Sequence, residues 1–172
     1  MRTEATEFRG VVERHQRMVF SLALRVTGEY GTAEEVAQDV FLELFRSAEK
    51  LSGDDHVRFW LRKVTVHRAT DALRRRAHRP ETQAEEWMDD APADGDGGAG
   101  LGTVLEARLE ELLGSLPEAM RVAVVLRYQE EMLPDEIAKL LGQPVATVKS
   151  NLQRGLKLLR RKAEITMKEY VR

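Results

Sequence analysis

Apolar residues recur at three- and four-residue steps along most of the chain, the spacing that places them on one face of an α-helix. In the first 80 residues this pattern predicts three helices. The first covers about 8–26 and ends at Thr27-Gly28, and the third covers 57–76. The second begins at Thr32, because Thr32 and Glu35 have the spacing of a capping box. The positions expected to face the core are Phe8, Val11, Val12, Met18, Val19, Leu22, Val26, Val36, Val40, Phe41, Leu44, Phe45, Phe59, Trp60, Val64 and Leu73.

The most specific pattern is a helix-turn-helix in the second half of the chain. One helix is predicted over 134–141, and a second, longer one starts near Pro144. Gly142 lies between them, where a helix end favours a residue that tolerates the left-handed conformation. Ala138 and Gly142 are small, so we expect the two helices to approach each other closely there. The buried face of the long helix is predicted to contain Val145, Val148, Leu152, Leu156 and Leu159.

Two further helices are predicted before the helix-turn-helix. One begins at about Thr103, and the other begins near Ser115, which has capping-box spacing to Glu118. The apolar face of the first of these two helices is expected to contain Val104, Leu105, Leu109, Leu112 and Leu113.

Residues 80–102 differ in kind from the helical segments. They are rich in Asp, Glu, Gly and Pro, contain no Lys or Arg, and start with Pro80, which ends the preceding helix. Such a composition buries too little apolar surface to fold, so we predict a flexible acidic linker. Its bulky residues, Trp87 and Met88, are expected to dock on a neighbouring surface. The predicted fold is therefore all-α, with two small helical domains at 1–79 and 103–172 joined by this linker.

The net charge of −2 over 172 residues conceals how unevenly charge is distributed. Residues 1–79 carry +3, residues 80–105 carry −7 and residues 106–172 carry +2. The third predicted helix, extended to Arg79, has eight Lys and Arg residues but only one acidic residue. Residues 144–162 contain no Asp or Glu. A helix with one buried face and one basic face, presented by a turn, suits the DNA major groove. Basic faces exposed only to solvent are the alternative.

Several function classes are not supported by the composition. The absence of cysteine excludes disulfides, thiolate zinc sites and cysteine nucleophiles. No apolar run approaches the roughly 20 residues of a membrane span, and the N-terminus lacks the apolar core of a signal peptide. We therefore expect a cytoplasmic protein that does not insert into membranes. The four histidines are scattered, and no Ser/His/Asp, P-loop or HExxH pattern occurs, so we expect neither an enzyme nor a cofactor.

Three segments together resemble bacterial RNA polymerase sigma factors of the sigma-70 class, specifically the extracytoplasmic-function (ECF) group. AEEVAQDVFLELFR resembles the family's polymerase-binding helix. FWLRKVTVHRATDALRRR resembles the helix that opens the −10 promoter element. SLPEAMRVAVVLRYQEEMLPDEIAKLLGQPVATVKSNLQRGLKLLRR resembles the domain that reads the −35 element. The resemblance covers nearly the whole chain.

In the first domain, the resemblance implies contacts to polymerase and to single-stranded DNA. The positions that match the contacts to the β′ clamp helices are Gln38, Asp39 and Phe41. Those that match the helix at the −10 element are Arg62, Lys63, His67, Arg74 and Arg75. The family usually has Asn where His67 stands, and an imidazole can also stack on an unstacked base. Residues 52–55 match the loop that captures a flipped base.

In the second domain, the resemblance implies a recognition helix for the −35 element. The matching groove-facing positions are Thr147, Lys149, Ser150, Asn151, Gln153 and Arg154. The family commonly has Arg at position 151, and Asn pairs best with adenine, so the −35 sequence is expected to differ. Arg160, Arg161 and Lys162 are assigned to phosphates or solvent.

The resemblance also implies partners. They are core RNA polymerase, through its β′ clamp helices and β flap, promoter DNA, and an anti-sigma factor. The free protein is expected to be a monomer. In the family, polymerase performs the phosphoryl chemistry, which agrees with the expectation of a non-enzyme.

Two other interpretations stay open on the sequence. The helix-turn-helix also resembles the LuxR-type module, which would make the chain a two-domain transcriptional regulator that binds duplex DNA without polymerase. The eight cations of the third helix argue against this, because a sensor domain needs no DNA-facing helix. Alternatively, the basic helices dock on an acidic protein partner.

Overall fold

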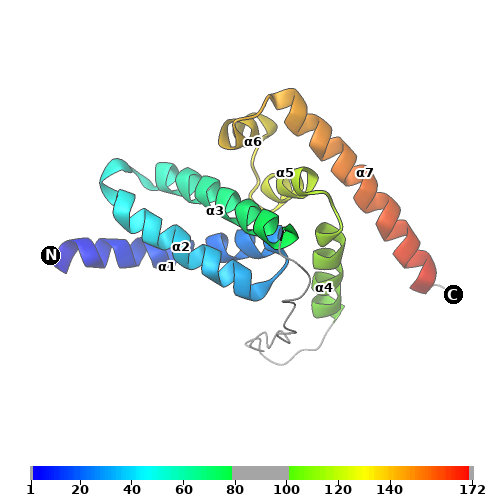
Figure 1. The fold of residues 1–172 in the computed structure, drawn as a ribbon, viewed down its shortest axis with the longest axis horizontal. Coiled ribbons are helices and arrows are strands. Elements are labelled where there is room, and N and C mark those ends of the chain that lie inside the picture. Colours follow the sequence, from blue (N-terminus) through cyan, green and yellow to red (C-terminus); the bar gives the residue numbers. More distant parts are fainter. Residues whose placement is uncertain (1, 79–100, 171–172) are drawn as a thin grey trace. The chain divides into compact units, whose positions relative to one another are not determined.

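The computed structural model describes residues 2–78 and 101–170, and the chain divides into two compact units, Met1–Trp87 and Met88–Arg172 (Figure 1). The described residues are helical with short connections and contain no β-strand. The prediction of an all-α fold with two small helical domains is confirmed. The predicted stop at Pro80, the docking of Trp87 and Met88, and nearly all of the predicted linker lie outside the described residues. The last two linker positions, 101 and 102, belong to a helix instead.

The first unit is a bundle of three long helices, α1 (Arg2–Thr27), α2 (Tyr30–Ser47) and α3 (Asp54–Ala77), with a short 3₁₀ helix, η1 (Ala48–Lys50), after α2. Each long helix packs against the other two, as Figure 1 shows. All three helices contribute buried apolar side chains because each repeats them at helical spacing. The core contains Val19, Leu22, Val26, Val36, Val40, Leu44, Leu61, Val66 and Ala69.

The turn between α1 and α2 is tighter than predicted. Gly28 has φ 73°, and its N–H donates to the carbonyl of Leu24 at 2.7 Å, which ends α1 as expected. The carbonyl of Glu29 already accepts the Ala33 N–H at 3.0 Å, so α2 begins at Tyr30. The Thr32 hydroxyl donates to the Glu29 carboxylate at 2.8 Å. The predicted capping box between Thr32 and Glu35 is therefore wrong.

Two inward faces are rotated from their predicted positions. On α2, Val36, Val40 and Leu44 fill the buried stripe, and Phe45, one residue further, is 63% exposed rather than buried. The Phe45 ring instead packs on the Phe8 ring in a T-shaped arrangement, with ring centroids 5.1 Å apart. On α3 the fully buried residues are Leu61, Thr65, Val66, Ala69 and Thr70, and the aromatic and aliphatic positions that the sequence favoured are only half-buried, namely Phe59, Trp60, Val64 and Leu73.

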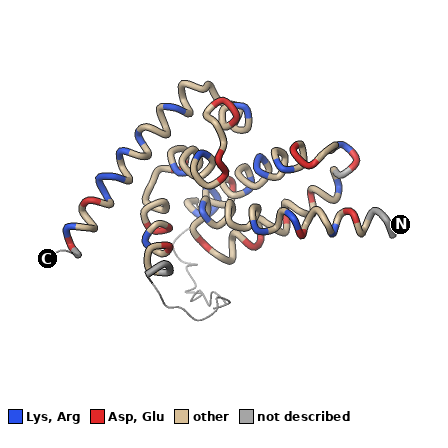
Figure 2. Tube along the Cα trace, turned by 180° about the vertical axis from the view of Figure 1, so that it is seen from behind, with Lys and Arg blue, Asp and Glu red and all other residues tan. Residues whose placement is uncertain are grey.

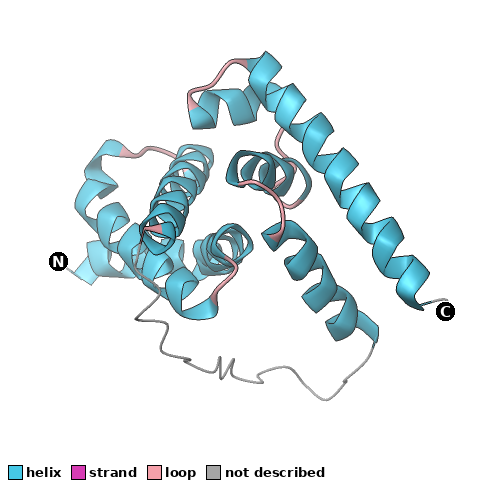
Figure 3. Cartoon of the chain, turned by 45° about the vertical axis from the view of Figure 1, so that its right-hand side comes forward, coloured by secondary structure: helices cyan, strands magenta, loops and turns pink. Residues whose placement is uncertain are grey.

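The second unit contains α4 (Leu101–Gly114), α5 (Glu118–Tyr128), α6 (Pro134–Leu141) and α7 (Val145–Tyr170). The long helix α7 packs against the other three (Figure 3). The bounds predicted for the helix-turn-helix are confirmed, since α6 covers 134–141 and α7 starts directly after Pro144. The core lies where these helices meet and contains Leu113, Leu116, Val122, Val125, Leu126, Ile137, Leu140, Val148 and Leu152.

The close approach between helices occurs at a different glycine from the one predicted. Gly142 has φ 63° and a Cβ added there would meet nothing within 4 Å, so its role is the left-handed helix cap alone. The Gln143 N–H donates to the Ala138 carbonyl at 3.0 Å and closes this cap. The tight contact is at Gly155 in α7, which faces Val124 and Met120 of α5.

The connection between α4 and α5 also lacks the predicted capping box. The Ser115 hydroxyl donates backward to the Leu112 carbonyl at 2.6 Å, and α5 starts after Pro117. The buried Arg121 stabilises this turn instead, because its Nη2 donates to the carbonyls of Gly114 at 2.7 Å and Leu116 at 3.0 Å. Burial lowers the pKa of the Arg121 guanidinium, and Glu118 raises it by less. The charge-assisted hydrogen bonds of this buried guanidinium tie the start of α5 to the end of α4.

Candidate nucleic-acid and protein interfaces

Lys and Arg recur over several turns of α7 (Figure 2), and most of them are exposed, so the outer face of this helix is basic. Thr147, Lys149, Gln153 and Arg154 are exposed, and Ser150 is half-exposed. Further along the helix the same face carries three more exposed cations, Lys157, Arg160 and Arg161. The Arg154 Nη2 donates to the Ser150 hydroxyl at 2.8 Å, which holds the guanidinium against the helix surface. Five of the six predicted −35 positions thus share one accessible helix face.

Asn151 does not belong to this face. It is only 9% exposed and lies in register with Val148, Leu152 and Gly155, at helical steps of three and four. Those three residues are buried against the rest of the unit, so the Asn151 side chain points inward with them. The expectation that Asn151 faces the DNA groove is therefore not supported.

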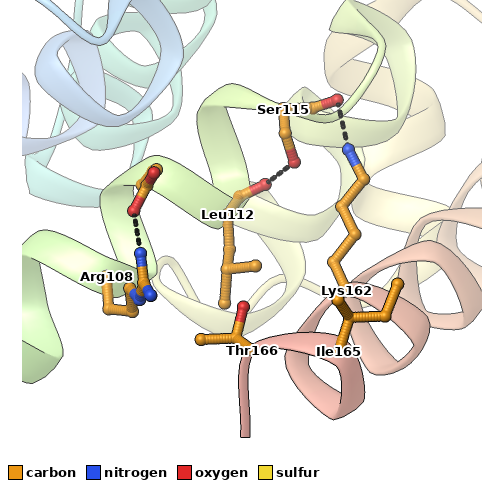
Figure 4. A pocket seen from close by; sticks show the side chains of 7 residues that line it. Arg108, Leu112, Ser115, Lys162, Ile165 and Thr166 are labelled. Atoms are coloured by element: carbon orange, nitrogen blue, oxygen red, sulfur yellow. Dashed lines mark hydrogen bonds and ion pairs between the residues drawn. The ribbon is translucent and has the colours of Figure 1, made fainter. Parts of the chain in front are cut away.

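Lys162 also differs from its assignment to phosphates or solvent. Its Nζ donates to the Ser115 carbonyl at 3.2 Å, which ties α7 to the turn after α4 (Figure 4). A shallow pocket lies beside this contact, between α4 and α7, and Leu112, Ile165 and Thr166 line it. Three α4 side chains that were predicted to face the core are more than 40% exposed, namely Val104, Leu105 and Leu109. Only Leu113 of that predicted face is buried.

The outer face of α3 combines cations with an imidazole. Lys63, His67 and Arg74 follow one another at four- and seven-residue steps and are exposed. Arg75 is exposed beside them, and Arg62 is half-buried. The five positions matched to the −10 helix therefore lie on the accessible part of α3, although Arg62 is set closer to the bundle.

Two other cations of α3 serve the bundle itself. The Arg68 guanidinium reaches across to α2, with Nε donating to the Glu43 carboxylate at 2.9 Å and Nη1 lying 3.6 Å from Asp39 Oδ2. Arg76 forms an ion pair with Glu29 in the turn between α1 and α2. These pairs explain part of the cation excess on α3 without any external partner.

The outer face of α2 carries exposed apolar residues. Gln38 is exposed, Asp39 is exposed and paired with Arg68, and Phe41 is half-buried. Leu42 and Phe45 lie on the same side at 56% and 63% exposure. Neither Leu42 nor Phe45 was predicted to contact a partner. Their position could have been predicted from the sequence, because Leu42 and Phe45 follow Gln38 by four and seven residues and therefore share its face of the helix.

The loop predicted over 52–55 overlaps the start of α3. Asp54 and Asp55 form the first turn of α3, where carboxylates interact favourably with the helix dipole. Leu51, Ser52 and Gly53 form the connection between η1 and α3, and Gly53 has φ 81°, a conformation that favours glycine. Residues 52–55 are all exposed, so this segment is accessible to a ligand.

Residues 2–78 and 101–170 contain no group of three or more His, Asp or Glu arranged to hold a metal ion. None of the helices in these two ranges is long and apolar enough to cross a membrane.

These faces define the class of protein. A helix-turn-helix with a basic outer face marks the second unit as a DNA-binding domain. Comparison with family models refines this, because residues 11–79 match the model for Sigma-70 region 2 and residues 106–159 match that for Sigma-70, region 4.

Individual relatives agree with these matches. The chain is 33% identical over 153 residues to the ECF RNA polymerase sigma factor SigE of Mycolicibacterium smegmatis, covering 87% of this chain and 59% of SigE. It is 24% identical over 163 residues to the ECF sigma factor SigW of Bacillus subtilis, covering 90% of this chain and 87% of SigW. The chain thus spans less than two thirds of SigE and most of SigW.

A solved structure shows the same fold. The sigma factor RpoE of Bartonella quintana, in complex with the anti-sigma factor NepR, superposes with a TM-score of 0.70 at 16% identity. The match covers 92% of this chain and 98% of RpoE. The chain belongs to the extracytoplasmic-function group of the sigma-70 family of RNA polymerase sigma factors.

Proposed function

We propose that this chain binds core RNA polymerase, directs it to promoters through −10 and −35 elements, and helps to open the −10 duplex. The observation that carries the proposal is the basic outer face of α7, backed by the buried Val148, Leu152 and Gly155. A rigid buried face holds the exposed side chains in a fixed orientation, which base reading in the major groove requires. The matches to regions 2 and 4 support the two-element arrangement.

In this proposal the −35 element is read from α7. The base-reading positions are Thr147, Lys149, Ser150, Gln153 and Arg154, and Asn151 is excluded because its side chain is buried. Arg154 is the side chain suited to guanine, since a guanidinium can donate to both O6 and N7. Arg160 and Arg161 lie farther along the helix and contact phosphates.

The −10 element is engaged by α3 and by residues 52–55. Lys63, His67, Arg74 and Arg75 present exposed cationic and aromatic groups to a single strand, with Arg62 at the edge of this surface. The cations contact the phosphates of the DNA strand, and the imidazole stacks on a base. Together these contacts stabilise unstacked DNA. No side-chain chemistry is required, so we propose a regulatory subunit that is not itself an enzyme.

Polymerase is bound through the outer face of α2. Gln38 and Asp39 supply polar contacts, and Phe41, Leu42 and Phe45 supply apolar ones. An exposed Leu and Phe with polar neighbours have the composition of an interface centre with a polar rim. The partner surface is the helical clamp of the β′ subunit, and the second unit contacts the β flap.

An anti-sigma factor is proposed as the regulator. The support is that RpoE and CnrH, two structural neighbours of this fold, were solved with NepR and with the cytosolic domain of CnrY, respectively. The regulator alternative of the LuxR type is not favoured, because residues 11–79 match sigma region 2 rather than a sensor domain.

In vitro transcription tests the proposal. Purified chain is added to sigma-free core polymerase on a pool of bacterial promoter fragments, and start sites are mapped. Defined start sites that require the chain are expected, with shared sequences upstream of them. If no initiation occurs while the chain alone shifts duplex DNA as a dimer, the proposal is wrong.

A further inference from the structure

His15 is the one buried histidine in the part of the chain that the structure describes. It lies in the middle of α1 at 6% exposure, while His56, His67 and His78 are exposed. Burying a polar ring is costly unless it is hydrogen-bonded. The His15 Nε2 lies 3.1 Å from the Oδ1 of Asp54, which is the first residue of α3. The two residues are 39 positions apart, so this contact joins distant parts of the first unit.

The contact fixes one end of the segment between α2 and α3. Asp54 directly follows Gly53, whose φ of 81° turns the backbone into α3. At the other side of this turn, the Ser52 N–H donates to Nδ1 of His56 at 3.4 Å. Two imidazoles, one buried and one exposed, therefore contact residues on both sides of Gly53.

The contact between His15 and Asp54 is stronger than the contact between His56 and Ser52. His15 belongs to the rigid core of the bundle, because α1 packs on both α2 and α3. His56 is exposed and its contact with Ser52 is long for a hydrogen bond. Arg14 also approaches Asp54 Oδ1, with Nε at 3.7 Å, but its side chain is 62% exposed. An exposed ion pair of this kind contributes little to positioning.

We infer that His15 is a positioning residue for the loop that captures an extruded promoter base, and that it acts through Asp54. The inference rests on the proposed function, in which residues 52–55 capture a base from the single-stranded −10 element. Selection of an extruded base depends on the shape of its pocket and on hydrogen bonds to the base edge. While the buried His15 holds Asp54, residues 52–55 keep the shape of the base pocket. Without this contact, the segment is expected to adopt several conformations and to accept several bases.

The test measures base discrimination by the holoenzyme formed from the full chain and core polymerase. Fluorescent single-stranded oligonucleotides carry the non-template −10 sequence found by transcription mapping, with each of the four bases at the captured position. His15→Ala is expected to reduce the ratio of affinities for the preferred and other bases by roughly tenfold, as loss of a hydrogen bond to a charged group does. Affinity for −35 duplex stays unchanged.

Three variants separate positioning from other roles. His15→Gln retains an N–H donor for Asp54 and is expected to keep most of the discrimination. Asp54→Ala changes a side chain that is 60% exposed and removes the carboxylate that His15 contacts. It is expected to lose discrimination as His15→Ala does. Arg14→Ala removes the other contact to the same oxygen and is expected to behave like the wild type.

Two results would overturn the role of His15. One is wild-type discrimination in Asp54→Ala, which decides the matter even if His15→Ala fails to fold. The other is an equal loss in Arg14→Ala, which would assign the effect to positive charge near Asp54. Failure of the proposed function looks different, because the wild-type holoenzyme would then show no base preference at any −10 position and no initiation.

Discussion

A Cβ atom added to Gly155 would lie 3.0 Å from Cγ2 of Val124, closer than packed carbon atoms normally approach. The same atom would lie 3.3 Å from the Met120 Cβ. Glycine thus lets α7 lie directly on α5. The side chains proposed to read the −35 element occupy the opposite face of α7, so this contact sets their distance from α5.

Gly155→Ala is expected to destabilise the second unit by about 1 kcal/mol. Overpacking a core costs about 1–3 kcal/mol, and the better helix propensity of alanine offsets up to about 1 kcal/mol. Urea unfolding with hydrogen exchange at α5 amides measures the change in the second unit. Val124→Ala removes the nearest atom and serves as the partner in a double-mutant cycle. The double variant should be less destabilised than the sum of the single variants, and simple additivity would contradict the contact.

Phe45→Glu is expected to weaken binding to a β′ clamp-helix fragment by about tenfold or more, because buried aromatic anchors dominate interface energies. Fluorescence anisotropy with the labelled fragment measures this affinity. The free energy of unfolding should fall by only about 1 kcal/mol, since Phe45 is more than half exposed and loses one ring contact, with Phe8. Tyr128→Glu, at an exposed aromatic of the second unit, is the matched control and should bind as the wild type does. Equal losses in both variants would argue against the α2 face.

Arg154→Ala and Lys157→Ala are expected to weaken −35 binding in different ways. Loss of Arg154 should cost about 1–3 kcal/mol and relax the preference for one base pair. Loss of Lys157 should weaken binding to all sequences and reduce the salt dependence by about one counterion. Duplex titrations at several salt concentrations, with each −35 base pair varied, distinguish the two.

Lys162→Ala is the matched control for these two cations, because the Lys162 ammonium donates to the Ser115 carbonyl. It should change DNA affinity much less than Lys157→Ala does. If the two lysine variants have the same salt slope, the division of α7 into DNA-facing and domain-facing cations is wrong.

Asn151→Ala is expected to lower the stability of the second unit by about 1 kcal/mol and to leave the −35 base preference unchanged. The reason is that Asn151 is 9% exposed and faces the domain interior. Gln153→Ala, two residues along and exposed, should show the reverse. Selection of −35 sequences from a randomised duplex pool, together with melting curves, compares the two variants. A changed preference at one base pair in Asn151→Ala would restore its role in DNA reading.

The sequence by itself determined which segments become helices and where the helix-turn-helix lies. The three- and four-residue spacing of apolar residues is a local property, and Gly28, Gly142 and Pro134 mark helix ends through their own backbone preferences. The bounds of α6 and the start of α7 could therefore be predicted closely. The basic faces of α3 and α7 could be predicted too, because the positions of Lys and Arg are given directly by the sequence.

Only the tertiary structure decided which side of each helix is buried and which polar groups meet. Phe45 and Asn151 could each lie on either side of a broad apolar stripe, and packing against neighbouring helices selected the exposed side for one and the buried side for the other. The contacts of His15 with Asp54 and of Gly155 with Val124 join residues far apart in the chain. Spacing along one helix carries no information about such pairs, since they depend on the angle and register at which two helices pack.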